Sequence, residues 1–284
     1  TGGGVHLADQ LLGDLVGDAD LGISQGRRAL AGRAELGWAA GAGEVAQLQA
    51  LGGSGDPSPT TALGVFHAMR AACAEAFGDP SLAGRRVVVQ GVGHVGMGLV
   101  ALLRADGASV AVADVSAGAV ETAVRDHGAE ALAVSAVVAA ECDVVAPCAL
   151  GGTISAESVP RLRCRVVCGA ANNQLATIED GDALAARGIV YAPDFVANAG
   201  GIINIAEEFV GYRAERAAAR ARGIEATTAR VFALARERGI SPARAAEAYA
   251  QERIDALVPL AARFRPGDRT AWSRGEPLRR LRPR

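Results

Sequence analysis

A strand, a glycine-rich loop and a helix follow one another without interruption between residues 85 and 103. The valine-rich run at 85–90 predicts a buried parallel strand, because valine packs well on a pleated surface that is covered on both faces. It runs into G-x-G-x-x-G at Gly91, Gly93 and Gly96, and an apolar helical pattern follows. This order is typical of an α/β fold whose glycine loop meets a ligand.

Each glycine of the loop has its own role in the predicted site. Gly91 makes the tight turn, Gly93 lets the backbone approach a pyrophosphate, and Gly96 lets the helix press on the strand. The helix N-terminus directs N–H groups and a partial positive charge at the phosphates. His94 and Val95, between the second and third glycines, are also predicted to contact the cofactor.

An acidic residue stands where a dinucleotide-binding unit needs one. The next predicted strand, 108–113, ends at Asp114, and 114 − 93 gives 21 residues from Gly93. That spacing suits a carboxylate that accepts hydrogen bonds from the adenosine ribose hydroxyls. The same charge repels a 2′-phosphate, so NAD is favoured over NADP as the cofactor. A strand–turn–helix unit that binds nothing remains the alternative, because a glycine motif alone is weak in a chain with 36 glycines.

Strands and helices alternate around this unit. Further elements are expected at 60–76 and 117–127 (helices) and at 132–134, 143–146, 165–168 and 189–192 (strands). The alternation predicts a Rossmann-type, doubly wound parallel sheet with ligands beyond the carboxyl ends of its strands. From 202 to about 263 the pattern is helical, with breaks at Gly223, Gly239 and Pro242.

The composition argues against several other classes of protein. A net charge of −2 gives no reason to expect a nucleic-acid partner. No apolar run reaches the ~18–20 residues of a membrane helix, and the start of the chain has no signal-peptide pattern. The five cysteines lack zinc-type spacing, so no metal site is predicted. They are interpreted as reduced thiols of a cytoplasmic protein.

Five motifs, in order along the chain, resemble one enzyme family. They are GDPSPTTALGV at 55–65, GVGHVG at 91–96, APCALGG at 146–152, ANNQL at 171–175 and YAPDFVANAGG at 191–201. Together they resemble the glutamate/leucine/phenylalanine/valine dehydrogenase family, with the leucine, valine and phenylalanine branch closest. The resemblance implies NAD-dependent oxidative deamination of a branched-chain or aromatic L-amino acid, by way of an imine, to a 2-oxo acid. It leaves a homo-oligomer open.

The resemblance also implies roles for individual residues. Thr61 would contact the nicotinamide carboxamide, and Cys148, Ala149 and Asn173 would line the nicotinamide ribose side. Asn198 would hydrogen-bond the substrate carboxylate. The two asparagines have an alternative role as turn-formers, because asparagine tolerates the left-handed conformation and caps helices.

The chain contains no lysine, and all 29 of its basic residues are arginine. In the family pattern, one lysine binds the substrate carboxylate and another activates water for imine hydrolysis. Arginine cannot replace the second lysine, because its guanidinium stays protonated. Asp20, in the segment 18–24, resembles the family's catalytic aspartate, although an acid there is also a common turn residue. His6 and His67 are the other substitutes for the base, with a packing role favoured for His67.

The resemblance divides the chain into four parts. Residues 1–60 correspond to a remnant of the substrate and dimerisation domain, and 61–201 to the NAD-binding domain. Residues 202–263 are helices expected to pack back on 1–60, and 264–284 form an Arg/Pro-rich tail expected to be poorly ordered.

Three interpretations of function follow. The chain is an amino-acid dehydrogenase, a non-catalytic or regulatory NAD-binding paralogue, or, because it begins at Thr1, a piece whose missing front part carries the lysines. In each case the chain as given is expected to bind NAD. Without the lysines it is expected to turn over amino acids weakly or not at all.

Overall fold

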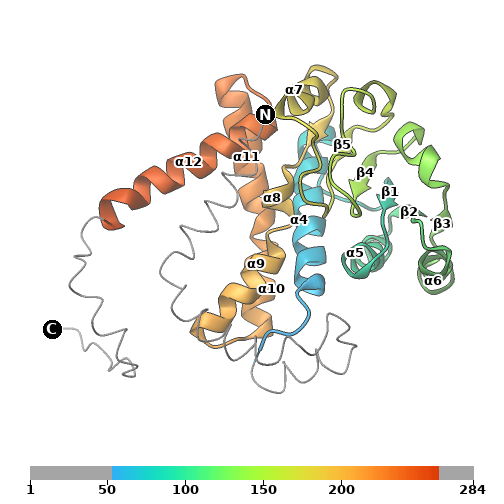
Figure 1. Ribbon diagram of the computed structural model, residues 1–284, viewed down its shortest axis with the longest axis horizontal. Helices are drawn as coiled ribbons and strands as arrows, with labels where there is room; N and C mark the ends of the chain where they lie inside the picture. The colour runs from blue at the N-terminus through green and yellow to red at the C-terminus, as the bar shows by residue number, and fades with distance from the viewer. Residues whose placement is uncertain (1–52, 262–284) are drawn as a thin grey trace, which may run out of the picture. The chain divides into compact units, whose positions relative to one another are not determined.

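The computed structural model describes residues 53–261, which form a parallel sheet flanked by helices (Figure 1). Within these residues the sheet has six strands in the order β3-β2-β1-β4-β5-β6, and each neighbouring pair is parallel. This strand order, reversing between β1 and β4, is that of Rossmann folds, so the predicted fold class is confirmed. The strands are β1 Arg86–Gln90, β2 Ser109–Ala113, β3 Glu130–Ala131, β4 Val144–Pro147, β5 Val166–Val167 and β6 Val190–Tyr191.

Helices precede, connect and follow these strands. None of those in residues 53–261 is long and apolar enough to cross a membrane. The α-helices are α4 Ser58–Phe77, α5 His94–Ala105, α6 Ala117–His127, α7 Ile178–Ala186, α8 Asp194–Ala197, α9 Gly200–Ala206, α10 Ala214–Arg222, α11 Ile224–Arg238 and α12 Pro242–Ala261. Short 3₁₀ helices are η1 Val134–Ala139, η2 Val159–Arg161 and η3 Glu207–Val210.

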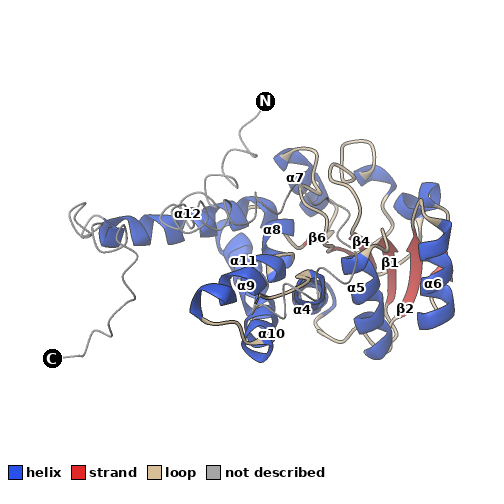
Figure 2. Ribbon diagram, turned by 60° about the horizontal axis from the view of Figure 1, so that its bottom comes forward, coloured by secondary structure: helices blue, strands red, loops and turns tan. Residues whose placement is uncertain are grey.

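Alternate residues of β1 enter two separate cores. Val87 and Val89 pack with apolar side chains of α4, α5 and α6 on one face. Val88 packs on the other face, in a cluster with Val137 of η1 and Leu184 of α7. A strand that is covered on both faces has no polar side, which is why its sequence is a continuous run of valine. Figure 2 shows α5 and α7 on opposite sides of the sheet.

The predicted elements are found with one strand misplaced. The strand expected at 132–134 is wrong, because β3 covers Glu130–Ala131 and η1 begins at Val134. The Leu132 N–H still donates to the Val112 carbonyl at 2.8 Å, and the chain then turns. Val137 is fully buried against the sheet. The apolar run therefore fills the core as a 3₁₀ helix and does not extend the strand.

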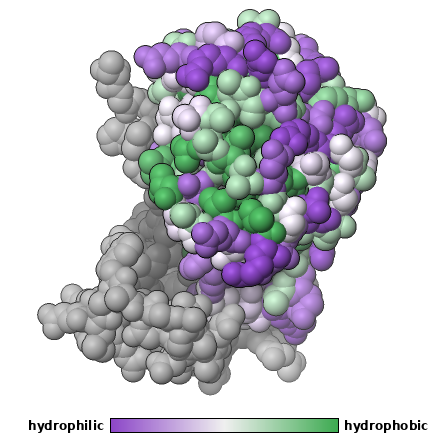
Figure 3. Space-filling view, turned by 90° about the vertical axis from the view of Figure 1, so that its right-hand side faces the viewer, coloured by the Kyte–Doolittle hydropathy of each residue, from purple (hydrophilic) through white to green (hydrophobic). Residues whose placement is uncertain are grey.

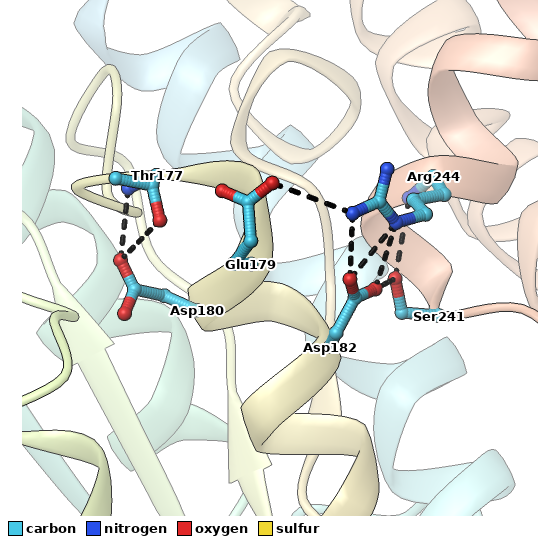
Figure 4. Close-up of polar contacts among 6 residues, drawn as sticks. All are labelled: Thr177, Glu179, Asp180, Asp182, Ser241 and Arg244. Atoms are coloured by element: carbon cyan, nitrogen blue, oxygen red, sulfur yellow. Dashed lines mark hydrogen bonds and ion pairs between the residues drawn. The ribbon is translucent and has the colours of Figure 1, made fainter.

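One helix that the apolar pattern does not mark, α7, begins at a capping box (Figure 4). The Asp180 carboxylate accepts from the backbone N–H of Thr177 at 2.8 Å and from its hydroxyl at 3.2 Å. Two residues on, Asp182 accepts from Arg244 at 2.7 Å and from the Ser241 hydroxyl at 2.6 Å. The bonds from Arg244 and then Ser241 hold the pKa of Asp182 below its usual range. They fix the first turn of α12 to α7.

Glycines bring α4 close to the helices on either side of it. A Cβ at Gly200, the first residue of α9, would overlap the carbonyl oxygen of Thr60. A Cβ at Gly98 of α5 would lie 3.1 Å from the Cβ of Ala62. The N-terminal turns of α4 are therefore wedged between α5, which carries the glycine loop, and α9.

The C-terminal helices pack mainly on other helices. α9, α10 and α11 lie against α4, and α12 lies against α11 and α7. The expected packing of 202–263 on residues 1–60 stays a prediction, because 1–52 lie outside the described residues, as does the tail from 262.

β3 is the outer strand on one side of the sheet, and Figure 3 views the molecule from that side. Apolar side chains gather in the middle of this face, and Val124 of α6 and Val134 of η1 are each 40% exposed. Glu130 of the strand itself pairs with Arg86 of β1 at 2.8 Å. A short, charged edge strand offers little to another strand for pairing.

The five cysteines are all free thiols in the described part of the chain. Burial raises the pKa of Cys73, Cys142 and Cys148 to about 12, and that of Cys164 to about 11. Burial also raises the pKa of Cys168 well above its usual range. Since the thiolate is the reactive form, these side chains behave as small apolar groups at neutral pH.

We expect the folded protein to resist alkylation by iodoacetamide at about pH 8, where an ordinary thiol with a pKa near 8.5 is partly ionised. Timed labelling followed by mass spectrometry measures this, and urea-unfolded protein is the control in which all five cysteines react. Rapid modification of one cysteine in the folded protein would show that its thiol is not buried.

A pair of Gly→Ala substitutions tests the contact between α4 and α9. Gly200→Ala is expected to lower the free energy of unfolding by ~1–3 kcal/mol, because the new methyl group overlaps the Thr60 carbonyl. Gly118→Ala is the control, since its Cβ meets nothing within 4 Å on exposed α6. It is expected to stabilise by up to ~1 kcal/mol. Urea unfolding measures both, and equal effects would contradict the close packing.

Candidate active site at the carboxyl edge of the sheet

The loops that follow β1, β2, β4, β5 and β6 all leave the same edge of the sheet, because its strands are parallel. Ligands of doubly wound sheets bind at this edge, near the reversal of strand order. Most of the predicted residues from Gly91 to Asn198 stand on these loops. His94, Val95 and Gly96 form the first turn of α5, and Thr61 stands on the first turns of α4.

Two glycines of the loop after β1 are required by the protein's own packing. Gly91 has a φ of +96°, and a Cβ there would lie 2.7 Å from the Cβ of Ala149. A Cβ at Gly96 would overlap the carbonyl oxygen of Gly91. Gly93 differs from both, because a Cβ there would meet nothing within 4 Å and its φ is an ordinary −68°. The space in front of Gly93 is therefore open.

The first turn of α5 is suited to binding an anion. The helix begins at His94 with Gly93 as its N-cap, no side chain caps the first N–H groups, and the first turn has no acidic residue. His94 is exposed, and Val95 is half-buried against the core. Uncapped N–H groups and the positive end of the helix dipole suit a phosphate.

Asp114 is held by the glycine loop and by the turn after β2. One carboxylate oxygen accepts from the Val92 N–H at 2.7 Å and the other from the Ser116 N–H at 2.8 Å. Each oxygen keeps a second lone pair, so the carboxylate can still accept hydrogen bonds from a ligand. The next residue, Val115, is 94% exposed.

The loops after β4 and β5 meet beside the glycine loop. The Cys148 N–H donates to the Gln90 carbonyl at 2.7 Å, which places Cys148 and Ala149 next to Gly91. Asn173 has a φ of +52°, unlike every other non-glycine residue described, and its carbonyl accepts from the Gly152 N–H at 2.7 Å. This is the left-handed turn conformation that asparagine tolerates.

Asn198 and Thr61 lie on the far side of this edge from Asp114. The Asn198 side chain donates to the Ala170 carbonyl at 3.2 Å and to the Asn172 side-chain oxygen at 2.7 Å. The Thr61 hydroxyl donates to the Pro57 carbonyl at 2.9 Å, and a Cβ at Gly201 would lie 3.0 Å from it. The structure thus brings both residues to the β5–β6 end of the edge.

Two residues of this region were not among those predicted. Asn172 holds Asn198, and the fully buried Gln174 holds the loop from within, with its side-chain N–H groups on two backbone carbonyls. The pair Asn172-Asn173 could have suggested the first. Nothing in the sequence pattern distinguishes a buried Gln174 from an exposed one.

His67, the one substitute for a catalytic base within residues 53–261, does not lie at this edge. His67 contacts Glu225 of α11 at 2.7 Å, and Arg70 contacts the same carboxylate at 3.3 Å. His67 and Glu225 border a cavity of about 630 Å³ between α4 and α11 that none of the predicted cofactor residues lines. Asp20 and His6 lie outside the described residues. No group of three or more metal-ligating side chains is found in residues 53–261.

Comparisons with known proteins address the same residues. The model of the glutamate/leucine/phenylalanine/valine dehydrogenase family matches residues 52–123 and 116–256. Leucine dehydrogenase from Thermoactinomyces intermedius is 48% identical over 208 residues, which are 73% of this chain and 57% of that protein. Valine dehydrogenase from Streptomyces virginiae is 48% identical over 210 residues, 72% of this chain and 58% of that one.

Two solved structures share the fold. L-tryptophan dehydrogenase from Nostoc punctiforme matches with a TM-score of 0.69 and 37% identity over 71% of this chain and 62% of that chain. Hetero-hexameric glutamate dehydrogenase from Thermus thermophilus, in a leucine-bound form, matches with a TM-score of 0.63 and 26% identity. This match covers 76% of this chain and 56% of that chain. The chain spans less than two thirds of the length of these relatives. It belongs to the glutamate/leucine/phenylalanine/valine dehydrogenase family.

Proposed function

We propose that this chain binds NAD at the carboxyl edge of its sheet and serves the oxidative deamination of an apolar L-amino acid. In that reaction NAD supplies the hydride acceptor, and the amino acid and water become a 2-oxo acid, ammonium, NADH and a proton. The observation that carries the proposal is the open position at Gly93, directly in front of the uncapped first turn of α5. The chain's own packing explains Gly91 and Gly96, whereas a pyrophosphate explains the room at Gly93.

The groups around Asp114 fit the adenosine half of NAD. The carboxylate is fixed by two backbone N–H groups and would accept from the ribose hydroxyls with its remaining lone pairs. Exposed Val115 gives an apolar surface for the adenine ring. The negative charge would disfavour a 2′-phosphate on the same ribose.

The loops after β4 and β5 would hold the nicotinamide half. Cys148 and Ala149 border the glycine loop, and Asn173 lies across from them, so we assign these three to the nicotinamide ribose side. Thr61 is assigned to the carboxamide, since α4 brings it next to the β6 loop. A neutral Cys148 thiol suits a packing role there, because burial raises its pKa to about 12.

The exposed face of α9 suggests the substrate side chain. Ile202 and Ile205 lie one turn apart, are 55% and 51% exposed, and follow Asn198 closely. Apolar side chains in this place would favour a branched-chain or aromatic amino acid, because binding such a substrate removes the surface of both isoleucines from water.

Asp20 is proposed as a proton relay for the amino group, on the family resemblance alone. Buried thiols suit the cytoplasm, and assembly into an oligomer is proposed by analogy with the hexameric relative.

Cofactor choice is tested at Asp114. We expect the unmodified chain to bind NAD more tightly than NADP, and Asp114→Asn to reduce that preference by about tenfold, because the charge facing the 2′-phosphate is removed. Asp106→Asn is the matched control, since Asp106 also accepts a backbone N–H, from Leu82 at 3.3 Å, but at the other end of α5. Calorimetry gives both affinities. Equal binding of NAD and NADP by the unmodified chain would contradict the role of Asp114.

Turnover tests the chemistry separately from binding. With NAD and L-leucine, L-valine or L-phenylalanine, the chain as given is expected to form NADH far more slowly than a typical enzyme, whose turnover is ~10 s⁻¹. The reason is that the chain as given has no lysine to act as the base, and a positioned general base raises a rate by about 10²–10⁴-fold. NADH absorbance measures the rate. Ordinary turnover would mean that another group supplies the base.

A further inference from the structure

Asn204 of α9 is a buried polar side chain that joins three segments of the chain. It is 1% exposed, and its side-chain oxygen accepts from the Thr60 hydroxyl of α4 and from the Tyr212 hydroxyl, each at 3.1 Å. Tyr212 stands between η3 and α10. An amide oxygen has two lone pairs, so these two hydroxyl groups use both. Asn204 therefore ties α9 to the first turn of α4 and to the segment that leads into α10.

The nitrogen of the same side chain is buried and has no hydrogen-bond partner within the described part of the chain. An unpaired buried donor destabilises a protein, so a side chain that only filled this space would do better as leucine, which has a similar shape. What distinguishes asparagine from leucine here is the oxygen that accepts from Thr60 and Tyr212. The unpaired nitrogen thus indicates that this joint needs the acceptor.

The turn of α4 that contains Thr60 also carries Thr61, which we assign to the nicotinamide carboxamide. α9 approaches this turn through two glycines. A Cβ at Gly200 would overlap the Thr60 carbonyl oxygen, and one at Gly201 would lie 3.0 Å from the Thr61 hydroxyl oxygen. Helices α4 and α9 pack side by side here (Figure 2). The hydrogen bond from Thr60 to Asn204 lies next to this contact, so it opposes a slide of α9 along α4.

The segment after α9 is held by charge. Glu207 directly follows α9, is 1% exposed, and pairs with Arg216 and, at 2.7 Å, with Arg220 of α10. The Arg216 guanidinium also donates to the Gly211 carbonyl at 2.7 Å, directly before Tyr212. Tyr212 is thereby fixed in front of α10, and its hydroxyl reaches back to α9.

Between these anchors, α9 presents Ile202 and Ile205 to the proposed substrate. We propose that Asn204 is a positioning residue for substrate choice. Through its bonds from Thr60 and Tyr212, it sets the distance between the two isoleucines and the nicotinamide position. Without these bonds α9 would shift, and the pocket for the amino-acid side chain would lose its fit. This inference rests on the proposed function.

The affinity for L-leucine relative to L-alanine tests the proposal. Both amino acids are titrated by calorimetry into NADH-saturated protein, for the unmodified chain and for Thr60→Val, Tyr212→Phe and Asn204→Leu. Asn204→Leu is expected to lower the leucine-to-alanine affinity ratio by about tenfold, because only leucine has a side chain long enough to reach the isoleucines. The other two variants each remove one hydroxyl bond and should lower the ratio less. The NAD affinity should stay unchanged in all three.

Two further variants separate positioning from general destabilisation. Thr60→Ser keeps the hydroxyl donor, so it should retain the affinity ratio that Thr60→Val loses. Thr228→Val removes a fully buried hydroxyl that donates to the Ile224 carbonyl at 2.8 Å within α11, and it should also leave the ratio unchanged. In the Asn204→Leu background, Thr60→Val should have no further effect, because its bond is already absent.

An unchanged ratio in Asn204→Leu would overturn the proposal, as would an equal loss in Thr60→Ser and Thr60→Val. If Asn204→Leu does not fold, Thr60→Val and Tyr212→Phe decide the question, and an unchanged ratio in both would overturn the proposal. Failure of the unmodified chain to bind NAD, or to bind L-leucine, would instead overturn the proposed function.

Discussion

The closeness of α5 to β1 is the constraint on which the nucleotide end of the structure depends. The backbone of Gly96 lies so close to the Gly91 carbonyl that no Cβ fits between them. This contact sets the angle at which α5 leaves the strand and brings its first N–H groups to the sheet edge. It also lets the Asp114 carboxylate accept from the Val92 N–H, and this bond ties the end of β2 to the glycine loop. A wider turn would separate the phosphate position from the ribose position.

Much of this end could be predicted from the sequence because its signals are local. The valine run, the glycine spacing and Asp114 all lie within one βαβ unit, where a strand and its helix are set by neighbouring residues. The edge strand was misplaced because an apolar run such as 132–138 suits a short strand or a core-facing 3₁₀ helix equally well. The start of α7 did carry a signal, the Thr177–Asp180 capping box, but no strong apolar period followed it.

The rest of the site could not be predicted, because it is made by backbone carbonyls brought together across loops. Asn198 was expected from its place in a motif, but the sequence does not show that Ala170 and Asn172 would use both of its donors. Nor does it show that the carboxamide of Gln174 would be wholly buried. His67 is a candidate that the structure places away from the sheet edge, where it contacts Glu225, which is distant in the sequence, between α4 and α11. Long-range pairing of this kind has no period in the sequence.

The approach of Gly200 to Thr60 has a consequence for the evolution of specificity. At that point α9 meets α4 through main-chain atoms, so the position of α9 does not depend on the size of the side chains that it exposes. Ile202 and Ile205 project from the same helix and are largely free of the core. Their volume can therefore change without moving the helix or the nearby Asn198. Under the proposed function, substitutions at these two positions would change the fit of an apolar substrate and leave the cofactor geometry intact.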